Sequence, residues 1–147
     1  MKRGLIFAGQ RIDYKSDAWQ MPQGGIELRE TPRNAALREL KEETGISMQH
    51  VEILCETKGW VKYDLPKDLV PKLWGGKFVG QKQKWFLLKM LAEDRDIKLD
   101  RSSSPEFDFC KWVSYWYPLD QVVNFKRDVY LRAMKELAPF TSKCVSK

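Results

Sequence analysis

The sequence predicts a single α/β domain built on a mixed β-sheet. Its 147 residues are the length of one ordinary domain, and a chain of that size buries about two-thirds of the surface that it exposes when unfolded. Short apolar stretches bounded by glycine, proline or turn residues alternate with two longer stretches in which apolar residues recur at helical spacing. Strands interleaved with helices are typical of α/β domains. We find no internal repeat or linker that would divide residues 1–147.

Strands are expected where apolar residues form short runs or alternate with polar ones. The candidate strands are 5–8, 19–21, 51–56, 59–63, 83–91 and 107–115. The segment 83–91 is the most apolar of them, so we expect it to be central in the sheet. Residues 64–80 contain two prolines and a Gly-Gly pair and are predicted to form a long loop. Loops of that length in a compact domain usually have a function.

Two helices are expected. The first begins at Thr31-Pro32, because threonine is a favoured N-cap and proline is favoured at the first helical position. We expect it to run through Glu43, with Gly45 as a left-handed C-terminal cap. Its apolar stripe is formed by Ala36, Leu37 and Leu40. The second helix begins at Asn124, and its buried face is formed by Val129, Ala133 and Leu137.

Composition restricts the class of protein. A net charge of +6 and a pI near 9.2 favour a polyanionic partner. Three cysteines without a CxxC spacing indicate reduced thiols and no zinc site. No apolar stretch is long enough to span a membrane, and the apolar run near Met1 ends too early for a signal peptide. We therefore expect a soluble cytoplasmic protein with no membrane partner.

Three acidic residues share one face of the first helix. Glu39, Glu42 and Glu43 stand at i, i+3 and i+4, a spacing that brings their carboxylates together. Each like-charged pair costs about 0.2–0.5 kcal/mol, and the helix dipole also disfavours anions at this end. A divalent cation would turn the repulsion into coordination, since Mg²⁺ prefers carboxylate oxygens, water and phosphate. The alternative is a solvated acidic face with no ligand.

The residues around this triplet form a longer pattern. Gly24, Glu30, Arg38 and Gly45 precede and follow the glutamates at fixed intervals. Over 24–46 the pattern resembles the signature of the Nudix hydrolases at every fixed position. The resemblance implies an α/β/α sandwich and hydrolysis of a phosphoric anhydride. It also implies binding of Mg²⁺ or Mn²⁺ by the glutamate side chains and by the Gly24 carbonyl.

The same resemblance implies roles for single residues. Glu39 and Glu43 are the candidates for the general base. Glu30 and Arg38 are expected to form a structural ion pair that ties the loop to the helix. Glu106 is implied as a further metal ligand outside the helix.

One branch of the family resembles the chain over nearly its whole length. The matching segments are WQMPQGGIE at 19–27, GQKQKWFLL at 80–88, and 103–130. They resemble the bacterial RNA 5′-pyrophosphohydrolases, which are also described as dinucleoside polyphosphate hydrolases. The resemblance implies removal of terminal phosphates from 5′-triphosphorylated or diphosphorylated RNA, which leaves a 5′-monophosphate and promotes mRNA decay.

Several residues are candidates for binding the substrate. Lys126 lies in the first turn of the second helix, where a cation opposes the dipole unless it faces phosphate or a base. Phe125 and Tyr63 are candidates for stacking on a base. Gln81 and Gln83 share one face of a strand, and since Lys82 and Lys84 share the other, at most one pair faces the site. Arg11 matches a family position that contacts the RNA end.

Family members usually begin with an additional strand that carries a YRPGVG-like segment, whereas this sequence starts at Met1 without it. We expect either a coding start upstream of Met1 or a sheet with an open edge. A monomer is favoured, and no DNA partner is expected. Two other functions stay open: a dinucleoside polyphosphate hydrolase, and a non-catalytic RNA-binding module on the same fold. The intact glutamates favour an enzyme.

Overall fold

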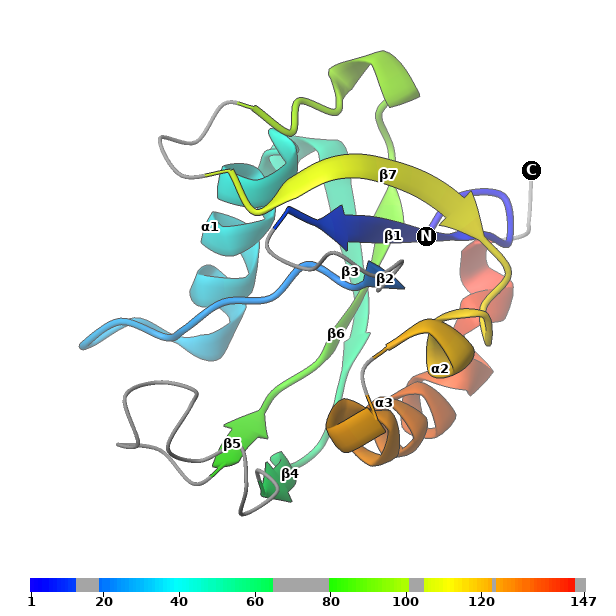
Figure 1. The fold of residues 1–147 in the computed structure, drawn as a ribbon. Coiled ribbons are helices and arrows are strands. Elements are labelled where there is room, and N and C mark those ends of the chain that lie inside the picture. Colours follow the sequence, from blue (N-terminus) through cyan, green and yellow to red (C-terminus); the bar gives the residue numbers. More distant parts are fainter. Residues whose placement is uncertain (13–18, 65–79, 101–104, 123, 145–147) are drawn as a thin grey trace.

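The computed structural model describes residues 1–12, 19–64, 80–100, 105–122 and 124–144. Helices and strands alternate along these segments, as an α/β fold requires (Figure 1). The strands are β1 Ile6–Arg11, β2 Trp19–Gln20, β3 Val51–Glu56, β4 Val61–Asp64, β5 Gly80–Gln83, β6 Phe86–Met90 and β7 Phe107–Val113. The α-helices are α1 Pro32–Thr44, α2 Pro118–Gln121 and α3 Asn124–Leu137, and the 3₁₀ helices are Met48–His50, Asp94–Asp96 and Ala138–Cys144. The predicted α/β class is confirmed.

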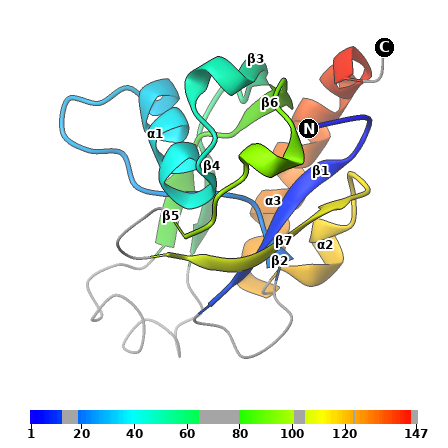
Figure 2. The same ribbon diagram turned by 90° about the horizontal axis from the view of Figure 1, so that it is seen from above.

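The elements are arranged in layers. In two views at right angles, α1 lies on one side of the strands, whereas α2 and α3 lie on the other (Figures 1 and 2). β1 is the middle strand of a three-stranded antiparallel sheet, with β2 on one side and β7 on the other. This pairing joins the beginning of the chain to residues about a hundred positions away.

The other four strands form one long interrupted hairpin. β3 pairs with β6, and β4 pairs with β5, both antiparallel. Between the two ladders the pairing is continued by one bond, in which the Thr57 backbone N–H donates to the Trp85 carbonyl at 2.9 Å. The apolar strand expected over 83–91 is therefore divided, since Gln83 ends β5 and β6 begins only at Phe86. In the register of the outer ladder, Tyr63 lies opposite Gln81.

Met1 extends the hairpin on the other side of β6. Its amino group donates to the Leu88 carbonyl at 2.6 Å, and the Met90 N–H donates to the Met1 carbonyl at 2.8 Å. One residue bonded to the two neighbours of Lys89 has the pattern of a parallel pairing. Every strand pair among the described residues is antiparallel, so the expected mixed sheet is not seen there, and only these two bonds of Met1 have a parallel pattern.

Local signals set both ends of α1. The Asn34 N–H donates to the Thr31 side-chain oxygen at 3.2 Å, and Pro32 is the first helical residue. Gly45 has a φ of 76°, and its N–H donates to the Lys41 carbonyl. Both predicted caps are confirmed, because capping depends on residues within one turn of the helix end.

The buried face of α1 was only partly predicted. The buried residues of this helix are Ala35, Glu43 and Thr44. The predicted stripe of Ala36, Leu37 and Leu40 is half-buried. Ala36 and Leu40 line a cavity, which keeps them from close packing.

The core lies between the β1–β7 sheet and α3. The predicted face of α3 is confirmed, since Val129, Ala133 and Leu137 are all buried, together with Tyr130. Val129 and Tyr130 pack in one cluster with residues of β1, β4, β7 and α2: Ile6, Ala8, Tyr63, Val113 and Leu119. No helix in the described part of the chain is both long and apolar enough to cross a membrane.

Candidate active site

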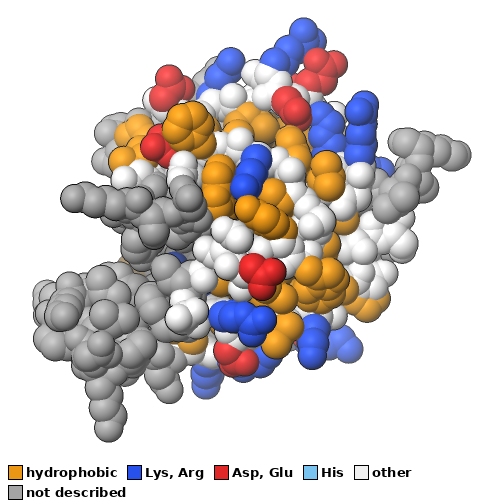
Figure 3. Space-filling model, turned by 45° about the vertical axis from the view of Figure 1, so that its right-hand side comes forward, with side chains coloured by type: hydrophobic (Ala, Val, Ile, Leu, Met, Phe, Trp, Pro, Cys, Tyr) orange, Lys and Arg blue, Asp and Glu red, His pale blue; other side chains and the backbone are white. Residues whose placement is uncertain are grey.

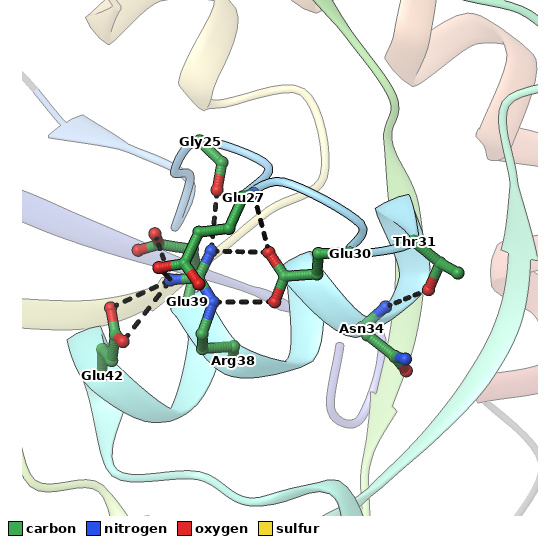
Figure 4. Close-up of polar contacts among 8 residues, drawn as sticks. All are labelled: Gly25, Glu27, Glu30, Thr31, Asn34, Arg38, Glu39 and Glu42. Atoms are coloured by element: carbon green, nitrogen blue, oxygen red, sulfur yellow. Dashed lines mark hydrogen bonds and ion pairs between the residues drawn. The ribbon is translucent and has the colours of Figure 1, made fainter.

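Arg38 ties the loop before α1 to the helix. Its Nε and Nη2 donate to the two carboxylate oxygens of Glu30 at 2.8 and 2.9 Å, and Nη2 also donates to the Gly25 carbonyl at 2.7 Å (Figure 4). The hydrogen bonds from Arg38 lower the pKa of Glu30 to about 2. The ion pair expected between Glu30 and Arg38 is therefore present. Its two parallel hydrogen bonds set the orientation of both side chains and hold the loop against α1.

The same guanidinium reaches two of the three helix-face glutamates. Arg38 Nη1 lies 2.8 Å from Glu39 Oε1 and 3.4 Å from each oxygen of Glu42 (Figure 4). Sequence reasoning paired Arg38 with Glu30 alone. The structure shows that Arg38 also offsets the repulsion between Glu39 and Glu42, and that the carboxylates of Glu39 and Glu42 are directed towards it.

Glu43 occupies a different environment. Only 4% of its surface is exposed. Its Oε2 accepts a hydrogen bond from the Gln23 N–H at 3.1 Å, whereas its Oε1 makes no hydrogen bond to the described residues. Burial, the neighbouring Glu106 carboxyl and the charge of Glu39 raise the pKa of Glu43 to about 10. Glu43 is thus a buried carboxyl for which the described residues supply no ion-pair partner.

Glu106 reaches the helix from another part of the chain. It directly precedes β7, and its carbonyl accepts a hydrogen bond from the Ile12 N–H at 3.0 Å, next to the end of β1. Its carboxyl acts electrostatically on both Glu39 and Glu43. Burial is the largest cause that raises the pKa of Glu39, and the charges of Glu42 and Glu106 add to it. Glu106 is therefore close enough to influence two helix-face carboxyls from a distant part of the chain.

Gly24, in the loop before α1, lies directly beside the Glu39 side chain. A Cβ atom at position 24 would overlap the side chain of Glu39, so the backbone here runs directly against that carboxylate. No such overlap exists at Gly25, where a Cβ would have nothing within 4 Å. Close approach of a glycine backbone to a functional group is a common reason for a glycine in a loop.

These residues fit a hard divalent cation. The buried Glu43 Oε1 is an acceptor that makes no hydrogen bond to the described residues, and the surrounding carboxyls carry more negative charge than Arg38 balances. In the described part of the chain, no three carboxylate, imidazole or thiol groups already converge on one point. The direction of Glu39 and Glu42 towards Arg38 accounts for this, because both carboxylates are occupied by its guanidinium.

The two glutamines expected at the site, Gln81 and Gln83, are half-buried and line a cavity of about 860 Å³, together with Glu39 and Gly24. Lys82 and Lys84 line the same cavity. Lys82 places its ammonium 5.0 Å from the centre of the Trp60 ring. Lys84 Nζ donates to the Thr57 carbonyl. Of the two pairs that the sequence left open, the glutamines are the pair whose side chains are joined to each other.

The remaining substrate candidates are distributed differently. Lys126 and Tyr63 are buried, with 5% and 7% exposure, and neither is among the described residues that line the cavity. Tyr63 packs in the core cluster, so stacking on a base would require its ring to leave that cluster. The side chains of Arg11 and Phe125 lie outside the described residues. Sequence reasoning did not single out Trp85 for the site, although it follows Gln81 and Gln83 at the same period of two.

Comparison with known proteins identifies the class to which this fold and this carboxylate cluster belong. The model of the NUDIX domain family matches residues 1–137, and the chain belongs to this family. The predicted membership of the Nudix hydrolases is confirmed, and with it a hydrolase that acts on pyrophosphate bonds. Hydrolases of this family generally need divalent metal ions.

Individual relatives extend the comparison. The chain is 53% identical over 136 residues to the RNA pyrophosphohydrolases of Pseudomonas putida and Stutzerimonas stutzeri, an alignment that covers 92% of this chain and 84% of each relative. Among solved structures, it resembles the E. coli dihydroneopterin triphosphate pyrophosphohydrolase with a TM-score of 0.68 and 22% identity, covering 90% of this chain and 87% of that one. A C. elegans Ap4A hydrolase complex gives a TM-score of 0.62 and 21% identity, covering 92% and 89%. At these identities the two structures support the fold.

Proposed function

We propose that this protein is a metal-dependent RNA pyrophosphohydrolase. It removes the terminal phosphates from 5′-triphosphorylated or 5′-diphosphorylated RNA and leaves a 5′-monophosphate, the end that promotes mRNA decay. The observation that carries the proposal is the likeness to relatives named RNA pyrophosphohydrolase, at 52–53% identity over 92% of the chain. The cluster of Glu39, Glu43 and Glu106 supplies the chemistry that such an enzyme needs.

In this proposal the carboxylates of Glu39, Glu42, Glu43 and Glu106 and the carbonyl of Gly24 hold Mg²⁺ or Mn²⁺. An ion bound there lowers the pKa of a bound water and neutralises charge on the phosphates. Glu39 or Glu43 would accept the proton that the attacking water loses, the role that the resemblance to the family implies for one of these two carboxylates. The water oxygen bonds to phosphorus as the anhydride P–O bond breaks, and the released phosphate carries away the bonding electrons.

Glu30 and Arg38 have a structural role in this scheme. They hold the loop from Gly24 to Glu30 against α1, so that the Gly24 backbone and the glutamate side chains keep a fixed spacing. Since phosphoryl transfer depends mainly on positioning and electrostatics, a fixed spacing contributes directly to the rate.

The polyphosphate and the first nucleotides are bound by Gln81 and Lys126, with Gln83, Tyr63, Arg11 and Phe125 as further candidates. The net charge of +6 favours an RNA over a small nucleotide, because a longer polyanion gains more from a basic surface. On the face drawn in Figure 3, lysine and arginine side chains are spread among hydrophobic ones and do not form a single patch. In this proposal, specific residues around the carboxylate cluster direct the RNA end. We place the enzyme in the cytoplasm, where RNA 5′ ends are produced, and expect a monomer.

The test is release of phosphate or pyrophosphate from a 5′-triphosphorylated oligoribonucleotide with Mg²⁺, with Mn²⁺ or with EDTA. We expect release that needs a metal ion and that falls at least about 100-fold in Glu43→Gln. Glu52→Gln, an exposed carboxylate on β3, serves as the control and should retain full activity. Binding of the oligonucleotide without release under any condition would support the RNA-binding module instead. Competition between the oligonucleotide and diadenosine tetraphosphate, measured as the ratio of their kcat/KM values, shows which of the two is the preferred substrate.

A further inference from the structure

Two side-chain hydrogen bonds connect three residues in and just after β5. The Trp85 indole Nε1–H donates to Gln83 Oε1 at 2.9 Å, and Gln83 Nε2 donates to Gln81 Oε1 at 3.2 Å. All three side chains are half-buried and line the cavity that also contains Glu39 and Gly24. We call these three residues the Trp85 relay.

The relay has a fixed polarity. An indole N–H can only donate, so Gln83 must turn its oxygen towards Trp85. The Gln83 amide nitrogen is then directed at Gln81, which in turn must present its own oxygen to accept. This bond engages one lone pair of the Gln81 oxygen and turns the oxygen towards Gln83, so the amide NH₂ group is the end that faces a partner on the other side. The donor-only ring of Trp85 thus determines which end of the Gln81 amide a ligand meets.

Trp85 itself is held firmly at the start of the relay. Its ring stands edge-on to Tyr130, with the centroids 4.8 Å apart and an interplanar angle of 83°, and Tyr130 is completely buried. Its backbone N–H donates to Thr57 Oγ1 at 3.1 Å. The Tyr130 hydroxyl accepts a hydrogen bond from the Met21 N–H at 3.1 Å, three residues before Gly24. The relay and the loop that carries Gly24 therefore share one anchor.

We propose that Trp85 and Gln83 are positioning residues that orient the Gln81 amide so that its NH₂ group faces an anionic oxygen of the substrate's polyphosphate. This inference rests on the proposed function, in which Gln81 contacts the substrate. Without the relay, the amide of Gln81 can rotate and present its oxygen, which repels a phosphate oxygen. A rotating amide still makes the bond to the phosphate for part of the time, so we expect binding to weaken about three- to tenfold, less than for complete loss of a hydrogen bond to a charged group.

The first experiment needs no substrate and no activity. Side-chain ¹H–¹⁵N spectra of the Gln81 amide are compared between the wild type and Trp85→Phe, which keeps an aromatic ring against Tyr130 but removes the indole N–H. We expect the Gln81 amide to become more mobile in Trp85→Phe. Trp116→Phe is the matched control, because it removes an exposed indole from the turn between β7 and α2 and should leave the Gln81 signals unchanged. A Gln81 amide that stays equally ordered in Trp85→Phe overturns the relay.

The second experiment is a double-mutant cycle on a 5′-triphosphorylated oligoribonucleotide. Trp85→Phe should raise KM about three- to tenfold and change kcat less than twofold. In a Gln81→Ala background the same substitution should have no further effect, because it acts only through Gln81. An equal effect of Trp85→Phe with and without Gln81 would mean that Trp85 is merely structural, and would overturn the proposal.

A second variant covers the case in which Trp85→Phe does not fold. Gln83→Glu still accepts from Trp85 but cannot donate to Gln81, so it should also raise KM about three- to tenfold. Lys62→Met changes the net charge by the same amount at an exposed position of β4, opposite Lys82 and outside the described lining of the cavity, and its KM should change less than twofold. If Gln83→Glu and Lys62→Met raise KM equally, charge alone explains the effect and the relay is rejected. The spectra still decide on the relay if the chain proves unable to hydrolyse RNA.

Discussion

The backbone of Gly24 lies so close to the carboxylate of Glu39 that a single methyl group at position 24 would overlap it. The two residues come from different elements, the loop after β2 and the middle of α1. Arg38 holds these elements together through its bonds to the Gly25 carbonyl and to Glu30. The position of one metal-ligand candidate is therefore set by the residue before it on the helix and by a glycine in the loop.

Gly24→Ala should inactivate the enzyme while leaving it folded. The added methyl group must displace the Glu39 carboxylate, and a displacement of about 1 Å at a reacting centre can cost about 100-fold in rate. The measurement is kcat on 5′-triphosphorylated RNA, together with a thermal melt. Gly25→Ala is the matched control, since its Cβ would meet nothing within 4 Å, and it should keep its activity. Equal activity of the two variants would contradict the close approach that the structure shows.

Arg38→Lys should lower the Tm by a few degrees at neutral pH. Lysine cannot reproduce the two-pronged contact with Glu30 and the bond to the Gly25 carbonyl at the same time. The pKa of Glu30 is about 2 in the folded chain against an ordinary 4.5. The stabilisation by the pair is therefore fully present above pH 4.5 and is lost as the pH falls through about 2.

Thermal melts between pH 2 and 7 test the role of this ion pair. The difference in Tm between the wild type and Arg38→Lys should become smaller as the pH falls. Arg33→Lys provides the comparison, because the ion pair that Arg33 makes within the described residues is an exposed contact of 4.0 Å with Glu56. Its Tm should not change measurably. A difference in Tm between the wild type and Arg38→Lys that does not vary with pH would mean that the contact of Arg38 with Glu30 does not stabilise the fold.

Glu43→Gln should make the metal-free protein more stable at alkaline pH. The pKa of Glu43 is about 10 in the folded chain against an ordinary 4.5. Between these values the folded state keeps a proton that the unfolded state has released, so the free energy of unfolding falls as the pH rises. Glutamine resembles the protonated side chain and carries no such penalty. At pH 8 in EDTA we expect a gain of about 1–3 kcal/mol over the wild type.

Denaturant unfolding in EDTA at pH 5, 7 and 8.5 measures this gain, which should increase with pH. Addition of Mg²⁺ should make the wild type more stable than Glu43→Gln, since a metal ion stabilises only a chain that can supply the deprotonated carboxylate. If Mg²⁺ raised the free energy of unfolding equally in the wild type and in Glu43→Gln, Glu43 would not be a metal ligand.

Lys126→Gln should weaken binding of RNA. Lys126 lies in the first turn of α3, where a cation opposes the helix dipole, and only 5% of it is exposed. If Lys126 contacts a phosphate, kcat/KM for 5′-triphosphorylated RNA should fall about tenfold. The slope of log kcat/KM against log salt concentration should also become shallower by about one. Lys135→Gln, in the last turn of the same helix, is the control and should change neither quantity.

The sequence by itself determined the features that depend on neighbours along the chain. Both ends of α1 follow from Thr31, Pro32 and Gly45, because capping bonds span only one turn. The shared helix face of Glu39, Glu42 and Glu43 follows from the helical period. The buried face of α3 follows from its apolar spacing. The family could be inferred because its signature is a local pattern of this kind.

The tertiary structure alone decided which of these features meet. Glu106 joins Glu39 and Glu43 because β7 pairs with β1, a contact that no local pattern encodes. The division of the expected 83–91 strand, and with it the Trp85 relay, follows from the register of the long hairpin. The charge on Arg38 is shared between Glu30 in the loop and Glu39 and Glu42 on the helix because folding brings the loop back onto α1. Hydrogen bonds and charges act over a few ångströms in space, so their partners are known only once distant segments have packed together.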